Sequence, residues 1–335
     1  MRHSTVRLRV AAAALSLVTA CFALLLVPGA AGQREDDVHL TPREKPAQVA
    51  GQALLAHSKP IRSDVNVVLV PVTVTDAKSR PLVSLGKDNF LLYEGEQLQN
   101  IRYFSLEDVP ISIGVLLDLS KSMSNKIDLA REALGEFFKT ANPEDDYFVV
   151  TFADRPQVLA DTTQSVGTIR AKLADAVASG HTALLDAIYL GLNKLRHARY
   201  KRRALLIISD GGDNCSRYRT REIKSLVQES DVEIYAIGIF DSIFKTPEEW
   251  AGKRLLSEIT QATGGHTVAL GNARQLPEVA AAISLELRSQ YVLGYQPSNT
   301  ARDGSWRKIK VRLAPSATPE PAQVYAKHGY QAPEK

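Results

Sequence analysis

The stretch that decides the fold of this chain is residues 111–122, which read Ile111-Ser112-Ile113-Gly114-Val115-Leu116-Leu117-Asp118-Leu119-Ser120-Lys121-Ser122. Its first seven residues are mostly apolar and predict a buried strand. One carboxylate and two hydroxyl side chains follow that strand. A second apolar run, Ala204 to Ile208, comes before Asp210 in the same way. Two predicted strands therefore end in side chains that carry oxygen.

The region around these motifs alternates strands with helices, which predicts a mainly parallel sheet with helical crossovers. We expect strands at about 111–117, 147–153, 157–160, 204–209, 232–239 and 266–269. We expect helices at about 126–140, 166–178, 183–198, 220–229, 249–262 and 274–289. In the first helix, Ile127, Ala130, Leu134 and Phe138 recur at helical spacing and predict one buried face.

Five side chains form the candidate site: Asp118, Ser120, Ser122, Thr182 and Asp210. In an open α/β sheet, the loops at the carboxyl ends of the strands meet where ligands bind. Oxygen ligands without Cys or His suit a hard divalent cation, with Mg²⁺ favoured and Mn²⁺ or Ca²⁺ left open. The sequence therefore predicts a metal site at this edge of the sheet.

These motifs resemble the metal-ion-dependent adhesion site of von Willebrand factor type A domains. Gly180 to Ile188 is similar to the family's Gly-x-Thr-x-Leu-x-Asp-Ala-Ile segment, and Ser209-Asp210-Gly211 is similar to its second acidic loop. Gly264-Gly265-His266 is similar to the turn before the last strand. The resemblance covers about residues 111–288, and the flanks resemble those of a group of exported bacterial proteins with this domain.

The resemblance implies a Rossmann-like α/β fold whose metal-bound site takes a protein partner. The five candidate residues would hold the ion, and an Asp or Glu of the partner would complete its coordination shell. Two alternatives stay open: a structural envelope module whose ion only holds loops together, and a metal-dependent hydrolase on the same fold. We expect no enzyme, since the chain has no Gly-x-Ser-x-Gly elbow, Walker loop or dinucleotide-binding fingerprint.

The first 32 residues have the form of a signal peptide, so we expect export to the periplasm, the outer envelope or the medium. Arg2, Arg7 and Arg9 precede an apolar stretch from Val10 to Val27, and small residues follow. A retained membrane anchor and a lipid anchor at Cys21 are the alternatives. We expect no transmembrane segment after cleavage.

The remaining sequence predicts a second, smaller all-β domain. Residues 33–62 form a polar linker, and alternating segments lie in 63–109 and 291–335, on either side of the A domain at 110–290. We expect a strand or bent strand pair at 65–75, broken or edged at Pro71. We also expect 88–96 and 99–104 to form a hairpin over Glu94 to Glu96. The two flanks have the same character, which suggests that they pair with each other.

The composition indicates which kinds of partner the chain can bind. The chain has 335 residues with 44% hydrophobic and 23% charged residues, which is ordinary for a globular protein. Its formal net charge of +4 includes three arginines of the signal segment, so the rest is close to neutral. We therefore expect no nucleic-acid partner. Cys215 is the one Cys after the signal segment and lies five residues past Asp210. That spacing allows a place at the rim of the metal loops, but we expect a buried residue without a role in the site.

Overall fold

The computed structural model describes residues 67–106, 108–210, 212–240, 247–315, 317–318 and 321–334. The chain divides into two units, residues 1–61 and 62–335, and all described residues belong to the second. The predicted signal peptide and linker lie outside the described residues. Across the described ranges, no helix is both long and apolar enough to cross a lipid bilayer.

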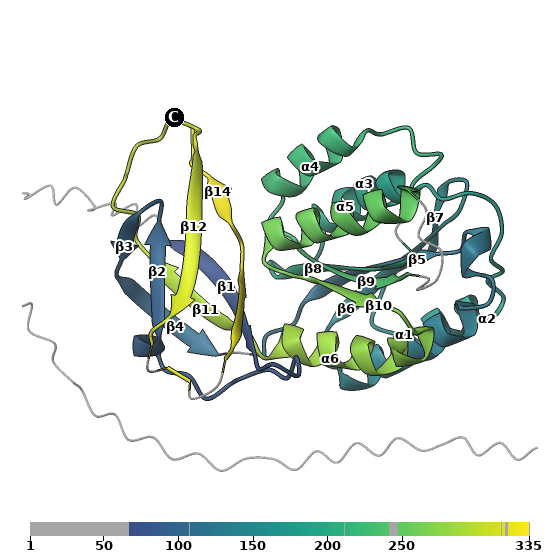
Figure 1. The fold of residues 1–335 in the computed structure, drawn as a ribbon, viewed down its shortest axis with the longest axis horizontal. Helices are drawn as coiled ribbons and strands as arrows, with labels where there is room; N and C mark the ends of the chain where they lie inside the picture. The colour runs from purple at the N-terminus through teal and green to yellow at the C-terminus, as the bar shows by residue number, and fades with distance from the viewer. Residues whose placement is uncertain are drawn as a thin grey trace, which may run out of the picture. The chain divides into compact units, whose positions relative to one another are not determined.

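A six-stranded sheet with the order β10-β9-β8-β5-β6-β7 forms the centre of the A domain (Figure 1). All neighbouring strands in it are parallel except β6 and β7. This confirms the predicted α/β fold with a mainly parallel sheet. The strands are β5 (Ser112–Asp118), β6 (Asp146–Phe152), β7 (Pro156–Thr163), β8 (Arg203–Ser209), β9 (Glu233–Ile239) and β10 (Thr267–Leu270).

Helices cover both faces of this sheet (Figure 1). On one face lie α1 (Ile127–Thr140), α2 (Val166–Ala174) and α6 (Leu276–Arg288), and on the other lie α3 (Leu184–Leu195), α4 (Thr220–Glu229) and α5 (Pro247–Thr263). The four residues predicted to form the buried face of α1 are all buried. The apolar side chains of each helix thus face the sheet, as an amphipathic pattern requires.

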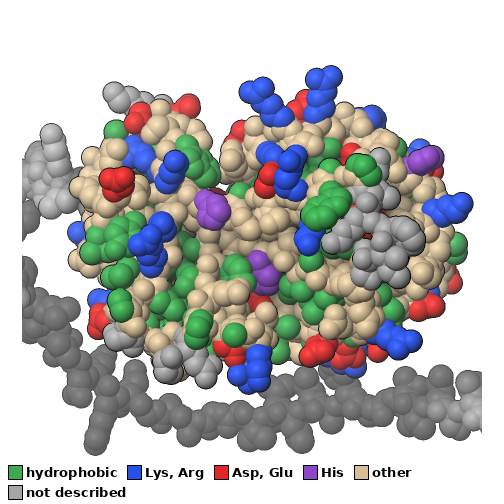
Figure 2. Space-filling view, in the orientation of Figure 1, with side chains coloured by type: hydrophobic (Ala, Val, Ile, Leu, Met, Phe, Trp, Pro, Cys, Tyr) green, Lys and Arg blue, Asp and Glu red, His purple; other side chains and the backbone are tan. Residues whose placement is uncertain are grey.

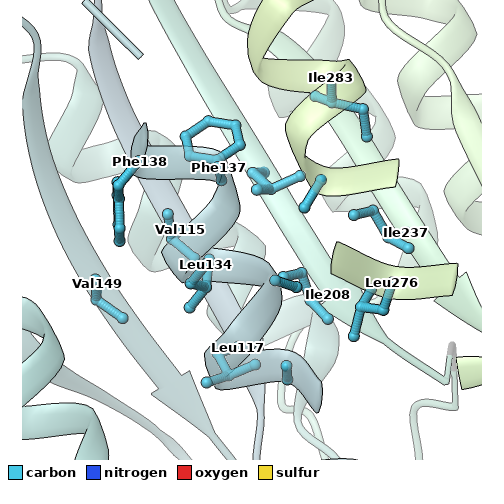
Figure 3. Packing of buried hydrophobic residues seen from close by; sticks show 14 of the residues in the cluster. Val115, Leu117, Leu134, Phe137, Phe138, Val149, Ile208, Ile237, Leu276 and Ile283 are labelled. Carbon is cyan, nitrogen blue, oxygen red and sulfur yellow. The ribbon is translucent and has the colours of Figure 1, made fainter. Parts of the chain in front are cut away.

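The hydrophobic core between the sheet and helices α1 and α6 holds β5 in place, and the last residue of β5 is Asp118. Figure 3 shows Leu134 and Phe137 of α1 packed beside Val115 of β5 and Ile283 of α6. All four side chains are at most 1% exposed. Burying an aliphatic or aromatic side chain of this size contributes roughly 1.5–3 kcal/mol. The strand that carries Asp118 is therefore held by a well-packed layer.

The segments on either side of the A domain form two antiparallel sheets, ordered β13-β1-β11-β4 and β14-β12-β2-β3. The first flank supplies β1 (Val68–Thr75), β2 (Phe90–Glu94), β3 (Gln97–Gln99) and β4 (Ile101–Leu106). The second supplies β11 (Tyr291–Tyr295), β12 (Trp306–Leu313), β13 (Gln323–Ala326) and β14 (Gly329–Gln331). Val72 and Tyr291 of one sheet share a core with Leu92 and Ile309 of the other. The two flanks therefore pair across the A domain and confirm the predicted all-β part.

The hairpin over Glu94 to Glu96 differs from the prediction in its second strand. β2 and β3 pair around Gly95, which has a φ of 59°. The chain then leaves this sheet, and residues 101–106 pair with β11 in the other sheet. Of the predicted second strand, 99–104, only Gln99 pairs with β2, where it lies opposite Leu92. The prediction is wrong for 101–104, because the long-range partner of these residues is β11.

Other elements also differ from the predictions. β1 is one continuous strand, and its pairing with β13 begins only at Val72, so Pro71 has no partner strand on that side. The helix predicted to reach residue 178 ends at Ala174. The Arg131 guanidinium accounts for this, since it donates to the carbonyls of Leu173 and Ala176. β14 was not predicted.

Candidate metal centre

The candidate residues lie at the carboxyl edge of the central sheet, at the end of β5 and on three loops. The first follows β5, the second precedes α3, and the third follows β8. Backbone hydrogen bonds tie the first loop to the second: Ser179 N donates to Leu119 O over 2.7 Å, and Lys121 N donates to Gly180 O over 3.1 Å. Gly180 has a φ of 80°, a conformation that favours glycine.

Asp118 is the last residue of β5 and is fully buried. Its Oδ1 accepts a hydrogen bond from Ser120 N over 2.8 Å, and its Oδ2 accepts one from Ser209 Oγ over 2.6 Å. Burial, and then the negative charge of Asp210, raise the pKa of the Asp118 carboxyl to about 6. The two carboxylates are therefore close enough to repel each other, which is the electrostatic setting that a cation would relieve.

Ser120 and Ser122 bring two hydroxyl groups to the same place. Their Oγ atoms lie 3.0 Å apart. Ser120 is 2% exposed and lies at the N-cap of the short 3-10 helix η2 (Lys121–Met123), but its side chain makes no capping hydrogen bond there. Ser122 is exposed. The hydroxyl pair therefore connects the buried carboxylate to the surface.

Thr182 is 4% exposed and is held through its backbone by the third loop. Thr182 N donates to Asn214 Oδ1 over 2.9 Å, and Asn214 N donates back to Thr182 O over 3.0 Å. Asp213 Oδ1 accepts a hydrogen bond from Leu185 N, which caps the first turn of α3 from another loop. Asp186 Oδ1 accepts hydrogen bonds from the backbone of Arg217 and Tyr218. The neighbouring polar residues thus position Thr182.

Asp210 directly follows β8 and is 7% exposed. Its Oδ2 lies 3.7 Å from the Nζ of Lys126, the residue before α1. The structure thus adds Lys126 and Ser209 to the site, neither of which was predicted as a site residue. Ser209 is adjacent to Asp210 in the sequence and could have been found there, whereas Lys126 gives no such signal.

Two other side chains near the site have roles at its rim. His181 is exposed, and its Nδ1 lies 2.9 Å from Asp154 Oδ1, so it forms a surface pair. Cys215 is half-buried, with its Sγ near the carbonyls of Ala153 and Asp154. Burial and the acids around it raise the pKa of its thiol, which favours the protonated form.

The donor set fits a divalent cation of the hard, oxygen-seeking kind. Two carboxylates and three hydroxyl groups carry it, so it has few of the ionisable ligands typical of a transition-metal site. Among the residues that the structure describes, no cluster of three or more His, Cys, Asp or Glu could hold a metal. Hydrogen bonds connect Asp118 to Ser120 and Ser120 to Ser122. Thr182 is held by the backbone hydrogen bonds of its loop with Asn214.

Residues 113–212 match the von Willebrand factor type A domain family. This part of the chain is therefore similar to a von Willebrand factor type A domain. An uncharacterized protein of Borreliella burgdorferi is 26% identical over 140 residues, which make up 39% of this chain and 41% of that protein. The chain thus matches less than half the length of this relative.

Several solved structures are similar to parts of this chain at low sequence identity. A von Willebrand factor type A protein from Catenulispora acidiphila is 14% identical, with a TM-score of 0.48 over 81% of this chain and 64% of that one. The PilB minor pilin from Streptococcus sanguinis is 12% identical, with a TM-score of 0.45 over 55% of this chain and 62% of that one. BatB from Bacteroides thetaiotaomicron is 16% identical, with a TM-score of 0.42 over 53% and 100%.

Proposed function

We propose that this chain binds a protein partner through a divalent cation, most naturally Mg²⁺, held by Asp118, Ser120, Ser122, Thr182 and Asp210. The observation that carries the proposal is the arrangement around Asp118: a fully buried carboxylate beside a second one, continued to the surface by two hydroxyl groups 3.0 Å apart. Von Willebrand factor type A domains mediate protein–protein interactions, which supports a binding role over catalysis.

The charge of the site explains why its partner would present a carboxylate. Ser and Thr oxygens coordinate a cation without neutralising it, so an ion held largely by hydroxyl groups stays electron-poor. Ser122 is the exposed member of the set, so the open side of the ion would face outward there. An Asp or Glu of the partner would supply a charged oxygen on that side.

We also propose that the chain acts outside the cytoplasm, in the periplasm, at the outer envelope or in the medium. The charged and apolar pattern of the first 32 residues supports export. An exported module with this site suits adhesion or assembly of the cell envelope. Export can be tested separately from metal binding. Sequencing of the amino terminus of the exported protein should show that it begins after residue 32.

Retention on immobilised peptides tests the binding role directly. One peptide library carries a single Asp per peptide, and its counterpart carries Asn at the same positions. We expect Mg²⁺-dependent retention on the Asp library, lost in chelator and in Asp118→Ala, and unchanged in the control Asp128→Ala, whose carboxylate is exposed on α1. Equal retention on both libraries, or retention that survives the chelator, would contradict the proposal.

A structural role for the ion would give a different result. In that case Mg²⁺ would raise the melting temperature of the wild type but not of Asp118→Ala, and neither protein would be retained on the Asp library. The buried positions of Asp118, Ser120 and Thr182 are the observation that keeps this second role in view.

A further inference from the structure

Lys126 occupies an unusual position at the start of α1. Its Nζ lies 3.7 Å from Asp210 Oδ2, and the two side chains are only 18% and 10% exposed. Lys126 is also the N-cap of α1, with no side-chain capping hydrogen bond. This places an ammonium group within the candidate metal centre, beside the carboxylate that follows β8.

A helix start is a poor place for a lysine. The N-cap favours Ser, Thr, Asp or Asn, whose side chains accept a backbone hydrogen bond, and the helix dipole disfavours a cation at this end. Lys126 therefore does nothing for α1 that a small polar residue would not do better. Its partner is Asp210, which belongs to a loop far away in the sequence.

We propose that Lys126 is a built-in counter-ion of Asp210 that competes with the divalent cation and makes its binding depend on the partner's carboxylate. The inference rests on the proposed function, and it names the residue that tunes that site. A cation that approaches Asp210 meets a positive charge already in place, and the two cations repel each other in a poorly solvated site. Lys126 thereby lowers the affinity for the ion alone.

The formal charges show why a partner would change this. Asp118 and Asp210 carry two negative charges, while a divalent cation and Lys126 would together carry three positive ones. One carboxylate from a partner makes the set neutral. Because linkage is reciprocal, the ion and the acidic partner then each strengthen the binding of the other. The site would hold its ion weakly when free and firmly when engaged.

Calorimetric titration of Mg²⁺ and Mn²⁺ into the full chain tests this inference. The test variant is Lys126→Gln, which removes the charge but keeps a polar side chain that can donate to Asp210. Lys126→Arg keeps the charge, and Lys139→Gln removes an equal charge at the other end of α1. We expect Lys126→Gln to bind the ion at least about tenfold more tightly than the wild type. Lys126→Arg and Lys139→Gln should match the wild type.

Each other outcome has a distinct meaning. Equal or weaker affinity in Lys126→Gln, with saturable binding by the wild type, overturns the role of Lys126 and leaves the metal site intact. If neither the wild type nor Lys126→Gln binds the ion, both this inference and the proposed function are overturned. Thermal melting in chelator gives a second measurement: Lys126→Gln should melt below the wild type and gain more on addition of Mg²⁺, because its two carboxylates lack their counter-charge. Equal melting and an equal gain in the two proteins would count against the inference.

Discussion

The Nδ1 of His266 and the Oε2 of Glu286 lie 3.6 Å apart, and within the described part of the chain neither atom has a hydrogen-bond partner. Glu286 is 1% exposed on α6, and His266 directly precedes β10 and stacks on Tyr325 of β13 with ring centroids 4.4 Å apart. Burial lowers the pKa of His266 to about 4 and raises the pKa of Glu286 to about 8. The pair is therefore neutral near pH 7 and lies where the A domain contacts a strand of the second flank.

Because of this pair, we expect the folded protein to lose stability at mildly alkaline pH. Between pH 4.5 and 8 the unfolded chain releases the Glu286 proton while the folded chain keeps it, so stability falls as pH rises through that range. His266 acts in the opposite direction only between pH 4 and 6.5. From pH 6.5 to 8 we expect the Glu286 contribution to cost up to about 2 kcal/mol. Urea unfolding should show this fall in the wild type and a smaller fall in Glu286→Gln; parallel curves would contradict it.

Ser209→Ala should weaken the candidate site from within. The hydroxyl of Ser209 donates to the buried Oδ2 of Asp118 over 2.6 Å, and its loss leaves that oxygen without this donor. We expect a loss of about 1–3 kcal/mol in unfolding free energy. The pKa of Asp118 should also rise further, because this hydrogen bond lowers it. Metal titrations at pH 6 and pH 8 should therefore differ more in Ser209→Ala than in the control Ser230→Ala, and an equal pH dependence would contradict the role of Ser209.

Asn214→Ala should disturb the site through Thr182. Asn214 Oδ1 accepts the hydrogen bond from Thr182 N, so its removal frees the loop that carries the threonine hydroxyl. We expect weaker ion binding with a stability loss of only about 1 kcal/mol, since Asn214 is exposed. Asn142→Ala, which removes a half-buried amide bonded to Asp108, is the control. Unchanged ion affinity in Asn214→Ala would show that Thr182 does not need this support.

Leu134→Ala tests the layer of α1 that holds β5. Leu134 is 1% exposed and packs in the core on the α1 and α6 face. Its truncation leaves a cavity, and we expect a loss of 2–5 kcal/mol, roughly. Val177→Ala, at a position that is 77% exposed, should change stability by less than about 0.5 kcal/mol. A small loss for Leu134→Ala in denaturant titrations would mean that this core is less important than its burial indicates.

The sequence predicted the features that depend on local pattern. The apolar runs before Asp118 and Asp210 predicted buried parallel strands, and helical spacing predicted the buried face of α1, and both were found. Strand alternation also identified the β character of the two flanks. These patterns are readable because each element's periodicity is written in its own residues.

Features that depend on distant partners could not be predicted in the same way. The segment 101–106 pairs with β11 instead of continuing the hairpin, and nothing in its own residues indicates which sheet it joins. Lys126 meets Asp210 only because α1 begins where β8 ends, at the same edge of the fold. The buried pair of His266 and Glu286 likewise depends on how α6 lies beside β10. Such contacts come from tertiary packing.

The most direct test of the central claim is calorimetric titration of Mg²⁺ into the chelator-stripped full chain and into Asp118→Ala, with Asp128→Ala as the control. We expect saturable binding of about one ion per chain by the wild type and by Asp128→Ala, and none by Asp118→Ala. Binding that persists in Asp118→Ala would place the ion elsewhere on the molecule. No binding by either the wild type or Lys126→Gln would contradict a metal centre at Asp118, Ser120, Ser122, Thr182 and Asp210.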